Sequence, residues 1–344
     1  MDRLLQTIER YKKLEIEKQI DYQKFYLYSI ITHSTAIEGS TVTEIENQLL
    51  FDEGITASKR SLQEQMMNLD LKNAYDKTQQ LAAQHIDYSS QMLCELSAIV
   101  IKNKCFTYNT TLGTFDASRG DLRLLNVTAG FGGRSYLSYN KVPTALHDFC
   151  QWLNKARTKL QPNNIIAAYR LSFAAHYRLV TIHPWADGNG RMARLVMNML
   201  QFERGLIASK VLKEQKAEYI DALNQARNAN NESIFEDAML RMHRQNLEAE
   251  IATYVGSLSE SLVQDDGQNV PKDVTKQLSE RQLFLLGLMQ VDAGITIAAM
   301  SQKAAVTERT IKRDLKHLQA LGLLQRVGTR KDGQWRVLCG NDGL

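Results

Sequence analysis

The chain has 344 residues, of which 44% are hydrophobic and 23% are charged, and it carries a formal net charge of +4. The opening "MDRLLQTIERYKKLEIEK" has charges of both signs, and no later stretch has the roughly 18 uncharged apolar residues that cross a membrane, which excludes a signal peptide and a membrane span. The four cysteines lie apart without CxxC or Cys/His spacing, which argues against a disulfide framework and a zinc site. We therefore expect a globular, cytoplasmic protein without a membrane partner, long enough for two or three domains.

Helices dominate the predicted secondary structure. Only four prolines interrupt the sequence, and apolar residues recur at helical spacing over long stretches. Residues 1 to about 90 read as consecutive helices, and the pattern is helical again from residue 162. Between them, "LLNVTAGFGGRSYLSY" (residues 124–139) predicts a β-hairpin, because strand-forming residues flank "GFGG". The polar segment 256–273, "GSLSESLVQDDGQNVPKD", predicts a linker before a small C-terminal unit.

The segment "HPWADGNGRMAR", residues 183–194, concentrates polar groups between two predicted helices. A helix that ends near Ile182 does not continue comfortably through His183, because the residue before a proline is disfavoured in the α region. The helical pattern resumes at "RMARLVMNMLQFERG", so residues 188–190 should lie at a helix N-terminus, where free N–H groups and the helix dipole attract anions. This position predicts a cradle for a phosphate chain.

The other side chains of this segment fit phosphoryl or nucleotidyl transfer. Asp187 would repel phosphates unless a cation lay between them, which predicts Mg²⁺ held partly by phosphate oxygens. Arg191 and Arg194 are three residues apart on a helix and can point at one anion. A neutral His183 is suited to take a proton from an attacking hydroxyl. A Rossmann fingerprint lacks its preceding strand here, an EF-hand does not fit Arg191, and no Walker A sequence is present, so a plain polar turn is the remaining alternative.

The complete segment resembles the motif of the Fic (filamentation induced by cAMP) family, HxFx(D/E)GNGRxxR, with Trp185 in place of the phenylalanine. The resemblance covers about residues 30 to 245 and includes "HDFCQWLNKA", "AAHYRLVTIHPW" and "EYIDALNQA". It implies a protein adenylyltransferase that moves AMP from ATP to a Ser, Thr or Tyr hydroxyl of a target protein, with self-modification expected.

The resemblance also implies a role for each matching position. His183 would be the catalytic base, and Asp187 would hold Mg²⁺ against the α- and β-phosphates of ATP. The phosphates would be bound by Gly188, Asn189, Gly190, Arg191 and, at the γ-phosphate, Arg194. A flap that pairs with an extended target segment would include Val127, Thr128, Ala129 and Gly130. The adenine region would contain Tyr219 and, where relatives have an asparagine, Arg227.

A second motif lies near the N-terminus. "STAIEGS" contains S-x-x-x-E-G, Ser34 to Gly39, which resembles the inhibitory motif of the same family. The alternative for Glu38 is a solvated carboxylate at a helix end. A carboxylate aimed at a motif arginine has a clear physical purpose, so we expect Glu38 to pair with Arg194 and to make the enzyme autoinhibited.

The C-terminal segment from Ile295 reads as helix, turn, helix and a two-stranded hairpin, which predicts a winged helix. Basic residues outnumber acidic residues nine to three between Ser301 and Arg336. On the helix at about residues 307–321, the buried stripe would be Ile311, Leu315 and Leu318. The exposed side would present four candidates for DNA contact, Arg309, Lys312, Arg313 and Lys316. The alternative is a winged helix used for protein contact.

These observations predict a mainly α fold: a Fic-type helical bundle with a small β-hairpin flap, followed by a C-terminal winged helix-turn-helix domain. The expected divisions are a helical region with the inhibitory motif (1–90), the catalytic core (91–255), a linker (256–275) and the winged helix (276–344). The alternative functions are a DNA-binding transcription regulator whose Fic core senses nucleotide, and removal of AMP from a target by the same site. The sequence leaves a homodimer open.

Overall fold

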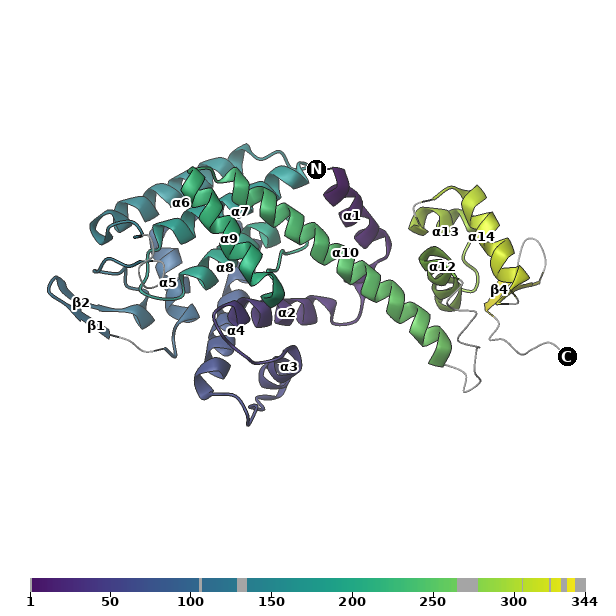
Figure 1. Ribbon diagram of the computed structural model, residues 1–344, viewed down its shortest axis with the longest axis horizontal. Helices are drawn as coiled ribbons and strands as arrows, with labels where there is room; N and C mark the ends of the chain where they lie inside the picture. Colours follow the sequence, from purple (N-terminus) through teal and green to yellow (C-terminus); the bar gives the residue numbers. More distant parts are fainter. Residues whose placement is uncertain are drawn as a thin grey trace. The chain divides into compact units, whose positions relative to one another are not determined.

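The computed structural model of the protein describes residues 2–104, 107–128, 135–264, 278–304, 306–321, 323–328 and 333–337 (Figure 1). The chain divides into two compact units, one of residues 23–243 and one that combines residues 1–22 with residues 244–344. Helices make up most of the described residues, as predicted. None of the described helices combines the length and the apolar composition that a bilayer crossing requires. The domain boundaries proposed from the sequence remain predictions.

Helix α8 (Asn189–Glu203) forms the centre of the first unit. Every residue from Arg191 to Gln201 is buried, and α8 packs against both α7 (Ile165–Ile182) and α4 (Leu62–Ala83). A helix that is buried on all its faces needs neighbours on every side. The other helices of this unit are α2 (Tyr22–Ile37), α3 (Glu44–Glu53), α5 (Ser90–Val100), α6 (Val142–Lys159) and α9 (Lys216–Ala229).

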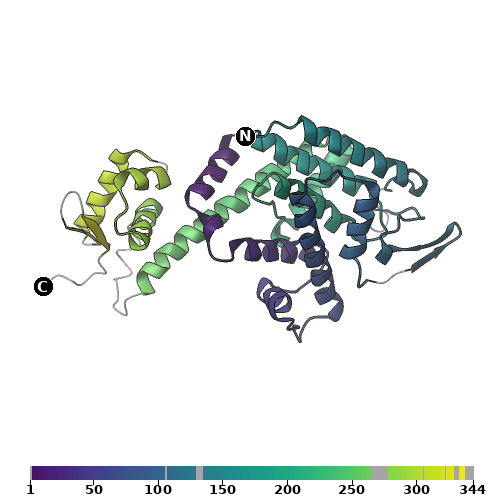
Figure 2. The same ribbon diagram turned by 180° about the vertical axis from the view of Figure 1, so that it is seen from behind.

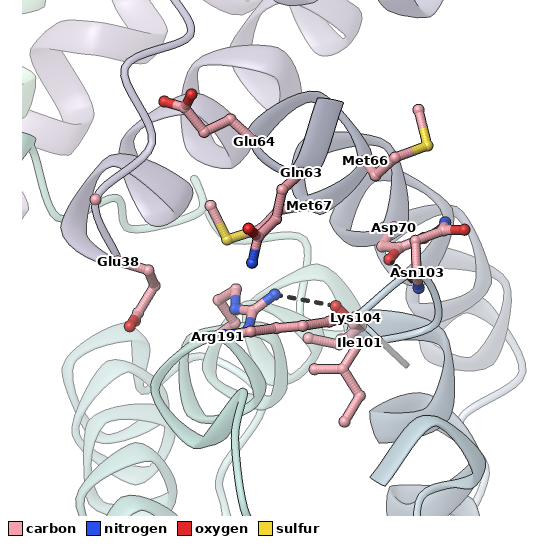
Figure 3. Close-up of a pocket in the computed structure, with 12 residues that line it drawn as sticks. Glu38, Gln63, Glu64, Met66, Met67, Asp70, Ile101, Asn103, Lys104 and Arg191 are labelled. Atoms are coloured by element: carbon pink, nitrogen blue, oxygen red, sulfur yellow. Dashed lines mark hydrogen bonds between the residues drawn. The ribbon is translucent and has the colours of Figure 1, made fainter. Parts of the chain in front are cut away.

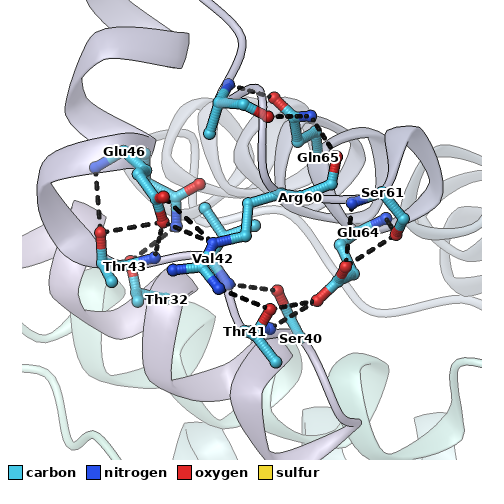
Figure 4. Close-up of polar contacts among 12 residues, drawn as sticks. Thr32, Ser40, Thr41, Val42, Thr43, Glu46, Arg60, Ser61, Glu64 and Gln65 are labelled. Carbon is cyan, nitrogen blue, oxygen red and sulfur yellow. Dashed lines mark hydrogen bonds and ion pairs between the residues drawn. The ribbon is translucent and has the colours of Figure 1, made fainter.

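The chain between α2 and α4 is tied down by polar contacts. Helices α3 and α4 both begin with a capping box. Arg60 Nε donates to Glu46 at 3.0 Å and its Nη1 donates to the Thr41 hydroxyl at 3.1 Å, while the Thr41 N–H donates to Glu64 at 2.7 Å (Figure 4). The segment that leaves α2 after Glu38 is therefore fixed to both of the helices that follow it.

A short hairpin that the sequence did not predict extends from the helical body of this unit (Figure 2). Strands β1 (Thr107–Thr110) and β2 (Gly113–Asp116) pair antiparallel, and the Tyr108 and Phe115 rings stack with their centroids 4.9 Å apart. Each strand has only four residues, and most of them are polar. Such short polar strands give a weak alternation signal, which explains why the pattern was missed.

Of the hairpin predicted at residues 124–139, the structure describes the two sides of the stem. Thr128 and Ser135 form an isolated antiparallel bridge, and the Tyr136 N–H donates to the Val127 carbonyl at 3.0 Å. The described residues of this segment form no regular strand. The predicted flap residues Ala129 and Gly130 lie outside the described residues.

The second unit contains three helices and a hairpin near the C-terminus. These are α12 (Glu280–Val291), α13 (Ile297–Ala304), α14 (Glu308–Ala320) and the antiparallel pair β3 (Leu324–Val327) and β4 (Gln334–Val337). Their shared core includes Leu285, Met300, Leu315 and Trp335. This order of elements matches the expected one, and the assignment to the winged-helix class stays a prediction.

Two further helices complete the description. Helix α1 (Asp2–Lys13) opens the chain, and α10 (Ser233–Gln264) runs through the boundary between the units. The segment predicted as a linker is therefore helical up to Gln264. Its composition of Ser, Glu, Leu, Val and Gln is compatible with a helix, which is why polarity alone placed the end of the helix too early.

Candidate functional site

The segment 183–194 joins α7 to α8 through two left-handed residues. His183 ends α7 with φ 54° and Gly188 begins α8 with φ 76°, so the helix end and the new N-terminus lie where they were predicted. Trp185 is fully buried, and its indole N–H donates to the Gly120 carbonyl at 3.2 Å. The Asn189 side chain accepts from the Trp185 N–H at 3.1 Å and donates to the Trp185 carbonyl at 2.8 Å. The loop is thus held by its own side chains.

The first turn of α8 already has a carboxylate against it. First-turn N–H groups have no helical acceptor and lie at the positive end of the helix dipole. A Cβ built on Gly190 would come within 2.7 Å of Oε1 of Glu38, so the carboxylate occupies space that a side chain at position 190 would need. The Asn189 side chain is engaged in the loop. Any contact from Asn189 to a bound phosphate would therefore come from its backbone N–H.

One ring nitrogen of His183 faces a backbone carbonyl. Its Nδ1 lies 3.3 Å from the Val180 carbonyl, an arrangement that places the proton on Nδ1 and the lone pair on Nε2. Burial lowers the pKa of His183 to about 4, and the nearby charge of Arg123 acts in the same direction. The Tyr136 ring stacks on the imidazole with centroids 3.8 Å apart. His183 is therefore neutral at physiological pH, as a general base must be.

Asp187 has a cationic partner that the sequence did not predict. Lys104 Nζ forms an ion pair with Oδ2 of Asp187, Arg191 Nη2 lies 3.5 Å from the same oxygen, and the Gly188 N–H donates to Oδ1 at 2.7 Å. Burial opposes ionisation of Asp187, but the Lys104 hydrogen bond and the Arg191 charge outweigh it and bring its pKa below the ordinary value. Asp187 is thus a carboxylate whose side chain is still 34% exposed.

The two motif arginines have different partners. Arg194 is buried and holds Glu38 with an Nη2 to Oε1 distance of 2.6 Å, as the inhibitory motif predicted. Its Nε and Nη2 also donate to the Ser34 hydroxyl and carbonyl, at 2.8 and 2.9 Å. Arg191 instead donates through Nη1 to the Val100 carbonyl at 3.1 Å and faces Asp187. The two arginines thus face different carboxylates here, and their joint contact with a phosphate stays a prediction.

Glu38 remains a carboxylate in this setting. Partial burial raises its pKa, whereas the charge and hydrogen bond of Arg194 lower it, and the net pKa lies below the ordinary value for glutamate. Gly39, directly after it, has φ 104°, so the backbone changes direction immediately after Glu38. Ser34 and Glu38 therefore approach Arg194 from the same end of α2.

The two residues predicted for the adenine region lie in different surroundings. Tyr219 is buried, with its hydroxyl 3.4 Å from Arg194 Nη1 and 2.8 Å from His176 Nε2. Arg227 places its guanidinium 4.7 Å from the centroid of the Tyr136 ring, the ring that stacks on His183. Tyr219 thus supports Arg194, and Arg227 lies beside the predicted flap. Their contact with a nucleobase stays a prediction.

Arg123 connects the stem of the predicted flap to the motif, and sequence reasoning missed it. This side chain is 1% exposed and donates to three carbonyls: Leu125 at 2.7 Å, His183 at 2.8 Å and Leu137. Its own N–H donates to the Pro184 carbonyl at 3.1 Å. A single arginine outside any motif gives no sequence signal for this role, because the carbonyls that it binds come together only in the fold.

The four predicted DNA contact candidates lie on one side of α14. Arg309, Lys312, Arg313 and Lys316 are exposed, and the predicted stripe of Ile311, Leu315 and Leu318 is buried. Lys312 makes an exposed ion pair with Glu308 at 3.4 Å, and Arg326 covers the Trp335 ring on the adjoining hairpin. The burial pattern of α14 confirms the predicted helix face. It does not test what binds there.

Comparisons with known proteins find relatives of this chain in one family. Residues 87–201 match the family model described as "Fic/DOC family". The chain is 26% identical over 242 residues to the protein adenylyltransferase fic-1 of Caenorhabditis elegans, covering 70% of this chain and 43% of that protein. It is 30% identical over 200 residues to the protein adenylyltransferase Fic of Drosophila persimilis, covering 57% of this chain and 35% of that protein. The chain thus spans less than half the length of these relatives.

A solved structure shares the fold. The crystal structure of a Fic domain containing signaling protein from Bacteroides thetaiotaomicron VPI-5482 superposes with a TM-score of 0.59 at 21% identity, covering 74% of this chain and 97% of that chain. At this level of identity, the similarity concerns the fold alone.

Proposed function

Because residues 87–201 match the model of the Fic/DOC family, we propose that this chain is an autoinhibited protein adenylyltransferase that moves AMP from ATP to a Ser, Thr or Tyr hydroxyl of a protein, itself included. One observation carries this proposal. A neutral His183, an ionised Asp187 and the first turn of α8, with the Glu38 carboxylate beside it, lie together in and around the segment 183–194. This set of groups suits transfer at phosphorus better than it suits a structural turn.

His183 is the proposed base. Its Nε2 takes the proton of the target hydroxyl while the hydroxyl oxygen forms a bond to the α-phosphorus of ATP. The bond from the α-phosphorus to the bridging oxygen breaks, and pyrophosphate leaves with that electron pair. The fixed Nδ1 proton supports this role, because the hydrogen bond to Val180 keeps the ring in one orientation.

The first turn of α8 is the proposed phosphate site. Gly188 and Gly190 permit close approach of the backbone, and the N-terminus of the helix favours a negative charge. Arg194 is the proposed γ-phosphate partner, held in place by Ser34 and Tyr219. The Glu38 carboxylate in this space supports the assignment, because a carboxylate and a phosphate seek the same donors.

Asp187 is the proposed ligand of Mg²⁺. A partly exposed carboxylate beside a phosphate site is a suitable donor for this ion, which prefers oxygen ligands and keeps several from water and substrate. The described residues contain no cluster of three or more histidine, cysteine or acidic side chains, so phosphate oxygens and water would complete the coordination. When bound, Mg²⁺ would neutralise charge on the phosphates.

Glu38 is the proposed brake. Paired with Arg194, it holds the donor that the γ-phosphate needs and puts its own charge against the incoming triphosphate. ATP then binds poorly, or binds with its α-phosphorus turned away from the attacking hydroxyl. Removing the carboxylate restores productive geometry and leaves the chemical groups unchanged.

Transfer of label from ATP to the full chain tests the proposal. With Mg²⁺ and α-labelled ATP, Glu38→Gly should label itself about 10²-fold faster than the wild type, which is the order of rate lost when reacting groups are misplaced. Glu38→Gln, which keeps the shape and loses the charge, should fall between them. Adding Arg194→Ala to Glu38→Gly should cancel the gain.

Two controls define the reaction. ATP labelled at the γ-phosphate should leave no label on the protein, and mass spectrometry should find AMP on a hydroxyl residue. Equal rates for the wild type and Glu38→Gly would show that Glu38 is not a brake. Label from the γ-phosphate would show that the chain is a kinase and not an adenylyltransferase.

A second activity is supported by the exposed basic side of α14. Four cations on one side of a helix, above a buried apolar stripe, form a surface suited to the phosphates of duplex DNA. We propose that the C-terminal unit binds DNA. Retardation of a duplex by the full chain at low salt supports this role, whereas no retardation would favour a protein-contact role.

A further inference from the structure

Lys104 lies beside Asp187 on a turn that is fixed by residues outside the motif. The turn follows α5, and within it the Lys104 N–H donates to the Ile101 carbonyl at 3.0 Å. Its neighbour Asn103 donates to buried Asp70 twice, through the backbone N–H at 2.9 Å and through Nδ2 at 2.6 Å. The backbone that presents Lys104 is therefore anchored to α4.

Both oxygens of the Asp187 carboxylate have partners in this state. Oδ1 accepts from the Gly188 N–H, and Oδ2 faces the Lys104 ammonium and Arg191. A divalent cation needs an oxygen lone pair that no other cation occupies. Arg191 is buried and tied to Val100, whereas the Lys104 side chain is 36% exposed and has the flexible stem typical of lysine. Lys104 is thus the partner of Oδ2 that can leave.

We propose that Lys104 is a positioning residue of the transfer site, whose ammonium group holds Asp187 in the absence of nucleotide and gives up Oδ2 to the divalent cation that arrives with the nucleotide. This inference rests on the proposed function, because it takes Asp187 as the metal ligand. Lys104 and the metal compete for one oxygen, so the lysine raises the Mg²⁺ concentration that the site requires.

A pocket next to the ion pair can receive the displaced side chain. It has a volume of about 200 Å³ and is lined by Lys104 and Arg191 together with the acidic residues Glu38, Glu64 and Asp70. In Figure 3, Gln63 and Met67 of α4 lie across this pocket from Lys104 and Arg191. Because Glu38 is paired with Arg194, the negative charge near the cavity comes mainly from Glu64 and Asp70, and it favours an ammonium group that has left Asp187.

Binding of ADP by the full chain tests this competition. ADP lacks the γ-phosphate, so the Glu38 and Arg194 pair does not stand in its way. Calorimetry at a series of Mg²⁺ concentrations gives the Mg²⁺ midpoint for the gain in ADP affinity. Lys104→Met should lower this midpoint about fivefold, the fold-change expected from removal of one partly exposed competing ion pair. Lys104→Arg, which keeps the charge, should stay close to the wild type.

The controls separate this inference from the proposed function. Lys77→Met, at an exposed lysine of α4, should leave the midpoint unchanged. An unchanged or higher midpoint in Lys104→Met would overturn the inference, as would ADP affinity that falls without Mg²⁺, because Lys104 would then be a phosphate ligand. If Asp187→Asn kept the full Mg²⁺ dependence, the metal assignment itself would fail and the inference with it. No ADP binding in any variant would overturn the phosphate site and the proposed function.

Discussion

The charged groups around the segment 183–194 and those on the exposed side of α14 differ in how the fold holds them. Arg194 is 3% exposed and has partners from α2 and α9, and Arg123 has its partners in three separate carbonyls. By contrast, Arg309, Lys312, Arg313 and Lys316 are exposed, and their positions follow from helix geometry alone. A buried charge with fixed partners recognises one ligand geometry, whereas an exposed basic surface attracts many polyanions. Substitutions in the two regions should therefore fail in different ways.

The largest effect is expected from His183→Ala in the Glu38→Gly background. Loss of the base should lower the rate of self-labelling by about 10² to 10⁴. ADP affinity should persist, because the first turn of α8 and the arginines remain. Quench-flow or filter assays measure the rate, and calorimetry measures the affinity. An undiminished rate would remove His183 from the role of base.

The second effect is a shift in the titration of His183. Burial disfavours the charged ring and lowers its pKa, so half of the His183 rings should be protonated at a pH of about 4. The ordinary pKa of histidine is about 6.5. In the ligand-free chain, NMR of labelled histidines should show a neutral His183 ring at pH 6, with His183→Ala assigning the signal. A transition near pH 6.5 would show that the ring is solvated, like the exposed cations of α14.

The third effect concerns α14 and should be spread over all DNA sequences. Lys312→Ala combined with Arg313→Ala should weaken duplex binding about tenfold. The slope of log K against log salt concentration should become shallower by about two, roughly one for each phosphate that is no longer neutralised. Anisotropy titrations at several salt concentrations measure both quantities. The matched control is Lys12→Ala with Lys13→Ala, at two exposed lysines of α1. An equal loss of affinity in that control would mean that net charge, and not the α14 surface, drives binding.

The smallest effect is expected from Tyr219→Phe, which removes one hydroxyl from the buried network around Arg194. Arg194 Nη1 loses an acceptor and His176 Nε2 loses a donor, and a net hydrogen bond is worth about 1 kcal/mol. In the Glu38→Gly background, KM for ATP should rise by about three- to fivefold with kcat nearly constant. Tyr177→Phe, at a buried tyrosine of the neighbouring helix α7, should leave KM unchanged. A loss confined to kcat would place Tyr219 nearer to the reacting atoms.

Much of the site could be predicted because its residues are close together in the sequence. The proline after His183 predicts a helix end, and the glycines before Arg191 predict a helix start. The structure has α7 ending at Ile182 and α8 beginning at Asn189, in agreement with both. The Glu38 and Arg194 pair is a contact between distant segments, and a second short motif was enough to predict it. Local backbone chemistry and recognisable motifs therefore account for the parts that were found.

The missed parts depend on contacts that no local pattern encodes. Lys104 and Arg123 are ordinary basic residues in the sequence, and their roles arise from an aspartate and from carbonyls that the fold brings to them. The β1 and β2 strands are too short and polar to alternate clearly. The end of α10 was placed too early because polar helices and polar linkers share a composition. The missed features thus depend either on tertiary contacts or on a local pattern too weak to interpret.

The missing side chain at Gly190 has a consequence for how this chain can change. A Cβ there would approach within 2.7 Å of Glu38 Oε1, so the Glu38 carboxylate uses the space that the missing side chain leaves, and we expect the phosphates to use the same space. A larger residue at this position would force the carboxylate to shift. A substitution that removes the Glu38 carboxylate and leaves the first turn of α8 intact must therefore lie at the end of α2 or in the chain between α2 and α4. The proposed brake and the proposed phosphate site come from separate stretches of the chain but use one space, so substitutions near Glu38 should change the proposed activity while the segment 183–194 stays intact.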